Sequence, residues 1–280
     1  MARVAVTILL AVVVAGCGSA DKKAAVKQPA ASQCTKSALA LQKPGQLTVA
    51  TDKPAYPPYF VNNDPSNGKG FESAVAYAIA AKLGFSHAEV KWITEPFNSS
   101  YAPGPKKFDF DVNEISITPK RSHVVDFSAP YYTAPQAVVA RNSSKVAHAT
   151  NLAALADAKI GVQIGTTSLD AVKQIVKPKS QPQVFNDSND TVSALKNGQV
   201  DAVVVDLPTA FYLTSAEVKG ARIVGQFNAP GGDSWGALLA KGSKLTPCVS
   251  RAVQSLRASG QLQQITKQWM GAAAGAPELR

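Results

Sequence analysis

The feature that most constrains the fold is the repeated alternation of β-rich runs with helical repeats along the 280-residue chain. Leu47–Ala50 is a β-rich run that stops at Asp52 and a proline cluster, which predicts a strand followed by a loop. Apolar residues then recur every four positions and end at Gly84, as in an amphipathic helix: Phe71, Val75, Ile79 and Leu83. Because strands alternate with helices, the fold class is predicted to be α/β.

The alternation continues to the end of the chain. Further strands are predicted over 90–93, 108–117, 159–164 and 200–205. The last of these is a near-continuous β-branched run, typical of a buried strand in a parallel sheet. Helices are predicted from apolar faces at Leu169, Val172 and Ile175, and at Leu262, Ile265 and Trp269. Two such series, separated by irregular chain near 131–137, indicate two lobes.

Polar side chains follow the predicted strands, where open α/β sheets bind their ligands. They are Asp52, then Ser116, Thr118 and Arg121, then Thr166 to Ser168, and finally Asp206. Arg121 offers a planar fork for a carboxylate, and the turn at 166–168 opens a helix whose free N–H groups favour an anion. Asp206 offers the opposite charge for an ammonium group. Both signs together suit a zwitterion such as an α-amino acid, although an arginine at a strand end also commonly forms a surface ion pair.

The N-terminus has the features of an exported, lipidated protein. Arg3 precedes the apolar run Val4–Val14, which is too short to span a bilayer but suits a signal peptide. The run ends in Val14-Ala15-Gly16-Cys17, which resembles the bacterial lipobox, with Val14 where leucine is usual. We expect a signal peptide over 1–16, lipidation of Cys17 and a tether over 17–46, rich in Ala, Lys, Gln, Ser and Pro. The alternative is an ordinary secretory signal with an incidental cysteine.

Two further cysteines, Cys34 and Cys248, remain in the chain. In an exported protein an even number of remaining cysteines predicts a disulfide. The chain-entropy model puts the stabilisation from closing the loop between these two residues at about 5 kcal/mol at most. The alternative is two unpaired thiols.

Charge and motif patterns argue against several other classes. The net charge is +10, but residues 47–270 carry 22 basic and 17 acidic residues without a basic stripe interleaved with aromatics, so no nucleic-acid partner is expected. The three histidines show no metal-ligand spacing, and no Gly-x-Ser-x-Gly element is present, so no metal, cofactor or serine-hydrolase site is predicted.

Several segments together resemble the amino-acid-type (family 3) solute-binding proteins of bacterial ABC importers, which include the glutamine- and histidine-binding proteins. The matching segments cover roughly 47–270: Leu47–Asp52, Pro58–Phe60, Gly70–Glu72, Ser116–Arg121, Val125–Tyr132, Gly161–Thr167 and Leu195–Ala202 with Asp206. The most specific pair is Ser-Ile-Thr-Pro-x-Arg with Asp-Phe-Ser-x-Pro-Tyr-Tyr.

The resemblance implies a two-lobe, type II periplasmic-binding-protein-like fold with a ligand cleft between the lobes. Lobe one would comprise 47–133 and 230–270, lobe two 134–229, and 271–280 would be a tail. Both cysteines would then lie on or beside lobe one.

The resemblance also assigns roles to individual side chains. Arg121 would bind the α-carboxylate with help from Ser116 and Thr166, and Asp206 would bind the α-amino group. Tyr56 and Phe97 would sandwich the ligand side chain. Asp52 and the 163–168 turn, which includes Ser168, would contact its tip.

One departure concerns Glu114, which stands where the family usually has glycine or serine. It either lines the cleft or is a strand residue that faces solvent or a lysine. With Asp52 and Asp206 it disfavours an acidic ligand, so a polar or basic amino acid is favoured.

The functional prediction is an extracytoplasmic, membrane-anchored receptor, expected to be a monomer, that hands an amino acid to ABC permease subunits without catalysing a reaction. The alternative is an exported cyclohexadienyl or arogenate dehydratase on the same fold, with Glu114 or Asp52 as general acid. A sensor lobe that feeds a signalling partner is a third possibility.

Overall fold

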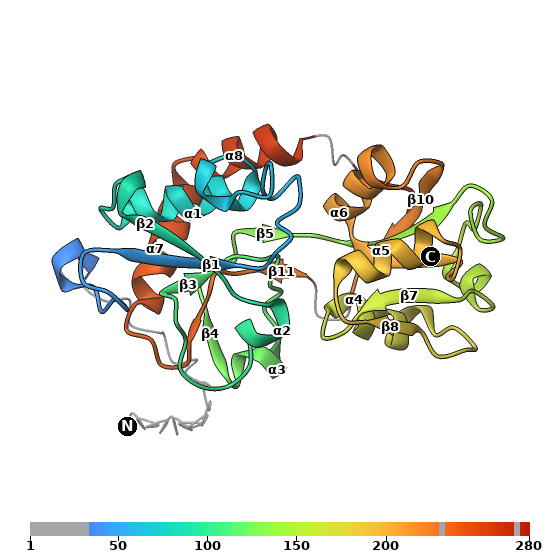
Figure 1. Cartoon of the computed structure of the whole chain (residues 1–280), viewed down its shortest axis with the longest axis horizontal. Helices are drawn as coiled ribbons and strands as arrows, with labels where there is room; N and C mark the ends of the chain where they lie inside the picture. The colour runs from blue at the N-terminus through green and yellow to red at the C-terminus, as the bar shows by residue number, and fades with distance from the viewer. Residues whose placement is uncertain (1–33, 230–232, 272–274) are drawn as a thin grey trace, which may run out of the picture.

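The computed structural model describes residues 34–229, 233–271 and 275–280, and within them the chain forms two five-stranded sheets (Figure 1). Lobe one, as the structure defines it, is built on the sheet ordered β2-β1-β3-β12-β4, and lobe two on the sheet ordered β10-β6-β9-β7-β8. The strands of lobe one are β1 (Leu47–Thr51), β2 (Val90–Thr94), β3 (Phe110–Asp111), β4 (Val125–Phe127) and β12 (Leu238–Ala240). Those of lobe two are β6 (Gln136–Arg141), β7 (Ile160–Gln163), β8 (Gln183–Phe185), β9 (Ala202–Asp206) and β10 (Ala221–Phe227).

Lobe one confirms the first strand and helix predicted from the sequence. All of β1 is buried, and it runs parallel to both β2 and β3. The helices of this lobe are α1 (Phe71–Lys82), α2 (Phe97–Ser100), α3 (Pro119–Ser122), α7 (Thr246–Ala258) and α8 (Gln261–Met270). Three of them, α1, α7 and α8, pack against one another and contribute to one continuous apolar core together with strands and loops of the lobe. The four-residue repeat of α1 therefore marks a buried helix face.

The predicted strand over 108–117 is wrong in extent. Only Phe110–Asp111 is a strand, because the backbone turns at Glu114, where φ is +48°. Regular structure begins again at Thr118, whose hydroxyl accepts a hydrogen bond from the Arg121 N–H at 3.2 Å and caps α3. The Thr-Pro start of this helix is as predicted. The irregular stretch between β3 and α3 lies at the carboxyl end of β3, where ligands bind in such sheets.

Lobe two places the β-branched run as the central strand of its sheet. Strand β9 lies between β6 and β7 and runs parallel to β7 but antiparallel to β6, so the prediction of a parallel strand holds on one side only. Apolar clusters cover both faces of this sheet. The helices here are α4 (Thr167–Ala171), which continues as a π-helical turn, α5 (Ser188–Lys196) and α6 (Leu207–Tyr212).

Two stretches of chain connect the lobes and lie side by side. Outgoing β5 (Tyr132–Thr133) pairs with returning β11 (Ser234–Trp235), and β6 pairs with six residues of β10. Both pairings are antiparallel. Because strand β12 enters the first sheet between β3 and β4, the chain leaves lobe one and later returns to it.

The folded body begins earlier than residue 47. Cys34 and Cys248 form a disulfide with their Cα atoms 5.4 Å apart, which confirms the predicted pairing. Leu39 and Leu41 pack on the core of lobe one, and the Gln42 N–H donates to Asp109 at 2.7 Å. Residues 34–46 are therefore attached to lobe one, although they fall within the segment expected to be a tether. Cys17, the predicted lipidation site, lies outside the described residues.

The last six residues lie against lobe two rather than lobe one, where α8 is located (Figure 1). Leu279 is 4% exposed within the lobe-two core, and its N–H donates to the Gln226 carbonyl at 2.9 Å. Gly225 permits this contact, because a Cβ there would lie 2.6 Å from Leu279 Cγ. The C-terminal segment therefore forms a third link between the lobes.

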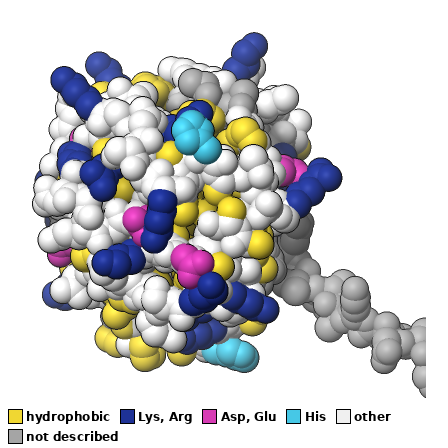
Figure 2. All heavy atoms as spheres, turned by 90° about the vertical axis from the view of Figure 1, so that its right-hand side faces the viewer, with side chains coloured by type: hydrophobic (Ala, Val, Ile, Leu, Met, Phe, Trp, Pro, Cys, Tyr) yellow, Lys and Arg dark blue, Asp and Glu magenta, His cyan; other side chains and the backbone are white. Residues whose placement is uncertain are grey.

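Among the described helices, none combines the length and apolarity that a membrane crossing requires. On the outer face of lobe two, Lys and Arg side chains are dispersed among neutral groups and a few acidic ones (Figure 2).

Candidate ligand-binding cleft

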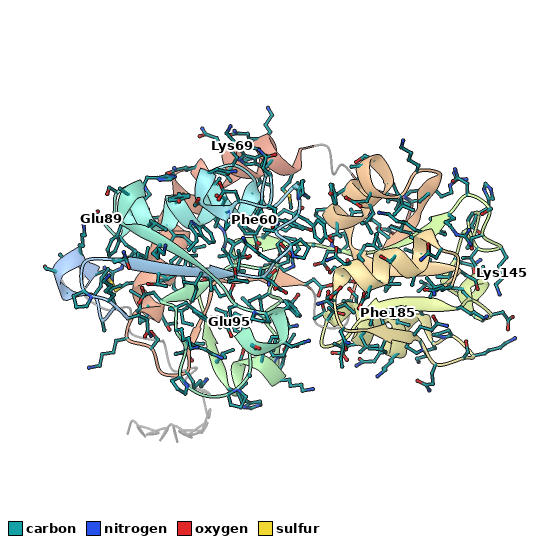
Figure 3. All side chains as sticks on the ribbon, in the orientation of Figure 1. Phe60, Lys69, Glu89, Glu95, Lys145 and Phe185 are labelled. Carbon is teal, nitrogen blue, oxygen red and sulfur yellow. A yellow bond between two sulfur atoms is a disulfide. The ribbon has the colours of Figure 1, made fainter. Side chains whose placement is uncertain are left out.

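A cleft lined by residues of both sheets lies between the lobes. Figure 3 shows side chains from both lobes facing each other there, with Phe60 on the lobe-one side. All nine residues predicted to contact a ligand line this cleft: Asp52, Tyr56, Phe97, Glu114, Ser116, Arg121, Thr166, Ser168 and Asp206. The topology explains their convergence, because each follows a strand whose carboxyl end faces the other lobe.

Arg121 is 6% exposed and lies where the two lobes meet. Its Nη1 donates to the Ser116 carbonyl of lobe one at 2.8 Å, and its Nη2 donates to the Gly165 carbonyl of lobe two at 3.0 Å. Burial lowers the pKa of the guanidinium, and the nearby Asp206 carboxylate acts in the opposite direction. These two bonds use two of the five N–H groups of the guanidinium. Because the guanidinium is planar and rigid, the directions of the remaining N–H groups are fixed as well.

Asp206 is held by a network that sequence reasoning did not identify. Gln136 Nε2 donates to Asp206 at 2.5 Å and to Asp233 at 3.0 Å, while Gln136 Oε1 accepts from the Ser168 hydroxyl at 2.6 Å. Burial, followed by the charge of Asp233, raises the pKa of Asp206 well above its usual range. A buried carboxylate with a like charge beside it favours a bound cation. Gln136 lies on a strand that joins the lobes, and its position in the sequence gave no signal of this role.

The hydroxyl groups of Ser116 and Thr166 are already engaged within the protein. The Thr166 hydroxyl donates to the Gln163 carbonyl at 2.8 Å and accepts from the Leu169 N–H at 3.1 Å, so it caps α4. Ser116 Oγ lies 3.4 Å from Thr167 Oγ1 across the lobes and donates to Asp233 at 3.3 Å. The structure therefore places Thr166 in the cleft as a helix cap, and it adds Thr167 as a neighbour of Ser116.

The two predicted aromatic residues line the cleft, but each contacts a protein partner. Arg121 lies over the ring of Phe97, 5.4 Å from its centroid, and over that of Tyr101 at 4.6 Å. Tyr56 reaches lobe two, where its ring centroid is 5.7 Å from that of Tyr212 and its hydroxyl donates to Asn189. Phe97 thus supports the arginine, and Tyr56 lies where the lobes close.

Asp52 shapes the lobe-one wall. Its Oδ2 accepts from the Phe97 N–H at 3.1 Å and its Oδ1 from the Lys53 N–H at 2.6 Å. These bonds fix the start of α2 relative to the end of β1. Asp52 therefore positions Phe97 and also presents a carboxylate to the cleft.

Glu114 has one carboxylate neighbour that sequence reasoning did not assign. The Glu114 N–H donates to Glu72 Oε1 at 2.8 Å, and the Tyr131 hydroxyl donates to the same oxygen. Glu72 is fully buried in the first turn of α1. Burial and the charge of Glu72 raise the pKa of Glu114 well above its ordinary value. Glu72 belongs to the Gly-Phe-Glu segment of the family resemblance, but a contact between residues 72 and 114 leaves no periodic sequence pattern.

Among the described residues, five hydrogen bonds or polar contacts cross the cleft and hold the lobes together. They join Arg121 to Gly165, Tyr101 to Gly165, Tyr59 to Thr209, Ser116 to Thr167 and Tyr56 to Asn189. The arrangement is therefore one in which the lobes are closed on each other.

Comparison with known proteins places this geometry in a family. The model for bacterial extracellular solute-binding proteins, family 3, matches residues 47–272. The arginine-binding periplasmic protein of Mannheimia haemolytica is 27% identical over 226 residues, which cover 78% of this chain and 89% of that protein.

Two solved structures show the same architecture. An ancestral arginine-binding protein bound to arginine has 30% identity and a TM-score of 0.67, covering 80% of this chain and 98% of that one. An ancestral amino acid-binding protein, described as a precursor of cyclohexadienyl dehydratase, has 27% identity and a TM-score of 0.64, covering 80% and 95%.

The family model spans nearly all of both lobes, and these structural neighbours share the two-lobe, type II periplasmic-binding-protein fold. The chain belongs to the bacterial extracellular solute-binding proteins, family 3.

Proposed function

We propose that this protein is a lipid-anchored receptor that captures an amino acid with a polar or basic side chain and delivers it to an ABC importer. The observation that carries the proposal is the presence of opposite charges at one cleft. Arg121 and Asp206 both line it, and they are close enough for the charge of Asp206 to affect the pKa of Arg121. An α-amino acid presents a carboxylate and an ammonium group on the same carbon atom, and the two charged residues of the cleft can each bind one of them. Charge-assisted bonds to both groups in a closed cleft support affinity in the micromolar range or better, roughly 8 kcal/mol.

The charge balance favours a basic or neutral ligand over an acidic one. The cleft lining carries four acidic side chains, Asp52, Glu114, Asp187 and Asp206, and two basic ones, Lys53 and Arg121. A ligand carboxylate would occupy Arg121, so an additional anionic group would face mostly acidic neighbours. The names of the arginine-binding relatives agree with a basic ligand.

Delivery to a permease and anchoring through Cys17 rest on the family resemblance and on the lipobox-like sequence. Labelled palmitate should enter the wild-type protein and not the Cys17→Ala variant. Incorporation that survives in the variant would contradict lipidation at this residue.

Binding without catalysis is favoured over the dehydratase alternative. The relatives reported above are named as binding proteins, including the ancestral precursor of the dehydratase. No reaction step is needed to explain the paired charges of the cleft.

Thermal-shift measurements against the twenty common amino acids, beside a turnover assay with prephenate and arogenate, test the proposal. We expect stabilisation by one or a few polar or basic amino acids and no turnover. Turnover without stabilisation by any amino acid would overturn the proposal in favour of the enzyme.

A further inference from the structure

The backbone at Glu114 adopts a conformation that few residues other than glycine tolerate. Its φ is +48°, in the left-handed region, and such conformations persist where the surroundings hold them in place. Here the Glu114 N–H is held by the Glu72 carboxylate at 2.8 Å. The turn carries the Glu114 side chain to the cleft lining, so the alternative of a solvent-facing strand residue does not hold.

The Glu114 N–H binds the Glu72 carboxylate at 2.8 Å, and the two carboxyl groups are close enough to influence each other's pKa. A bond between two carboxyl groups requires one proton, which acts as the donor between them. Among the described residues, no N–H or O–H donor reaches Glu72 Oε2, which is buried. Burial raises the pKa of both groups, and the charge of Glu72 raises that of Glu114 further. Burial and the repulsion between the two carboxylates therefore favour a proton held by the pair when the cleft is empty.

The groups around Glu114 come from several elements of both lobes. Those whose charges interact with it are Glu72 on α1, Asp52 after β1, Asp206 on β9, Tyr59 in the proline-rich loop and Tyr131 before β5. Asp111 on β3, whose pKa burial raises to about 8, interacts with Glu72. The cleft lining carries two cations, Lys53 and Arg121, and the proposed ligand carboxylate occupies Arg121. An added positive charge would thus be stabilised at Glu114.

Two further side chains of the cleft lining favour a ligand with polar groups. Asn113 is 8% exposed and Thr51 is 2% exposed, and both line the cleft. Asn113 Nδ2 and Thr51 Oγ1 have no hydrogen-bond partner among the described residues. Because buried polar atoms are normally paired, these atoms point to a ligand with hydrogen-bonding groups rather than to an apolar side chain.

We propose that Glu114 determines specificity by binding the positive charge of a cationic amino-acid side chain in exchange for the proton that it shares with Glu72. This inference rests on the proposed function and names its ligand class. In the exchange, the carboxyl O–H bond breaks, the proton passes to the solvent buffer, and the ligand cation takes its place. No other bond changes.

The exchange sets the sign of the pH dependence. Below the pKa of Glu114 in the empty protein, binding a cationic side chain must release a proton, so affinity rises with pH by up to about tenfold per unit. Above that pKa the dependence disappears. A ligand with a neutral side chain leaves the proton in place and shows no such rise.

Calorimetric titration of the full folded protein with L-arginine and L-citrulline tests the exchange. The two ligands share both α-groups and differ in side-chain charge. Titrations at pH 6.5 in two buffers of different ionisation enthalpy count the released protons. We expect arginine to bind at least about 30-fold more tightly than citrulline and to release about one more proton.

Two variants and one control complete the design. In Glu114→Gln, we expect the preference for arginine to fall to about threefold and the additional proton to disappear, with citrulline affinity retained. In Glu72→Gln, we expect the preference to remain and the proton release to fall. Glu95→Gln removes a carboxylate from the same lobe (Figure 3) at a described residue outside the cleft lining, and should match the wild type.

The outcomes separate the two proposals. If wild-type protein binds amino acids but releases equal numbers of protons with both ligands, or if Glu114→Gln retains the preference, the role of Glu114 is refuted and the proposed function stands. If wild-type protein binds no amino acid, the proposed function fails and this inference fails with it. If Glu114→Gln does not fold, the role of Glu114 is tested by the difference in proton release between arginine and citrulline in the wild type, together with the result for Glu72→Gln.

Discussion

The two walls of the cleft differ in the chemistry they present. Lobe one contributes the guanidinium of Arg121 and the carboxyl groups of Asp52 and Glu114. Lobe two contributes the carboxylates of Asp187 and Asp206, of which Asp206 is anchored by Gln136, and the hydroxyl groups of Thr166 and Ser168, which are already hydrogen-bonded within the protein. Under the proposed function, lobe one therefore contacts the ligand carboxylate and side chain, whereas lobe two contacts the ammonium group.

The lobes also differ in how their cores are closed. Lobe one is joined to its N-terminal segment by the Cys34–Cys248 disulfide, whereas lobe two is completed by a short C-terminal segment through hydrogen bonds and one buried leucine. We therefore expect loss of the disulfide to lower the stability of lobe one, whereas loss of side-chain hydrogen bonds should affect lobe two. Variants on the two lobes test these differences.

The largest expected effect is on the stability of lobe one. Replacing Cys34 and Cys248 by serine together should lower the free energy of unfolding by about 2–5 kcal/mol, because the denatured chain loses a 214-residue cross-link. Ligand affinity should stay within about twofold, since neither cysteine lines the cleft. Chemical denaturation with and without reductant measures the change. Equal stability of variant and wild type would contradict a structural role for the bond.

Arg121→Ala should weaken binding by about 100-fold, because the ligand carboxylate loses its bidentate partner in a buried site. Lys120→Ala is the matched control, since Lys120 is the exposed neighbour on the same helix. Calorimetric titration of both variants measures how much ligand affinity each of them loses. An effect of equal size in the two would mean that general charge, and not the cleft geometry, governs binding.

Asp206→Asn should weaken binding by about 30-fold while leaving the empty protein as stable as the wild type, or more so, at pH 7.5. The folded-state pKa of Asp206 is raised, so its ionisation lowers stability as pH rises from the unfolded value toward the folded one. Because Asp206→Asn removes the ionisable group, the variant does not undergo this decrease in stability. Affinity and melting temperature, measured together, distinguish the two effects; a variant that loses both would point to a structural role.

The smallest expected effect comes from the hydroxyl groups of lobe two. Ser168→Ala removes one hydrogen bond to Gln136 and should weaken binding by about threefold. Ser243→Ala changes a serine of lobe one that is outside the cleft lining and also removes one local hydrogen bond, so it serves as the control. A loss as large as that of Arg121→Ala would reverse the contrast between the lobes.

Local sequence patterns predicted much of this molecule. The four-residue repeat of α1 and the Thr-Pro cap of α3 appear as expected, because propensity and packing agree there. The nine candidate residues meet at one cleft because strand ends share an edge of each sheet.

Contacts between distant segments could not be predicted. Glu72 and Glu114 lie 42 residues apart, and their pairing depends on how α1 packs beside β3. The same holds for Gln136, which joins Ser168 to two aspartates, and for Leu279 in the core of lobe two. The predicted strand over 108–117 is interrupted because a tertiary hydrogen bond holds Glu114 in the left-handed region.

The central claim is that the two walls hold opposite ends of one zwitterion. Its most direct test is calorimetric titration with L-arginine, with agmatine, which lacks the α-carboxylate, and with 5-guanidinopentanoate, which lacks the α-amino group. The account predicts that each analogue binds at least about 100-fold more weakly than arginine, because each leaves Arg121 or Asp206 without its partner. Binding of either analogue within about threefold of arginine would contradict the account.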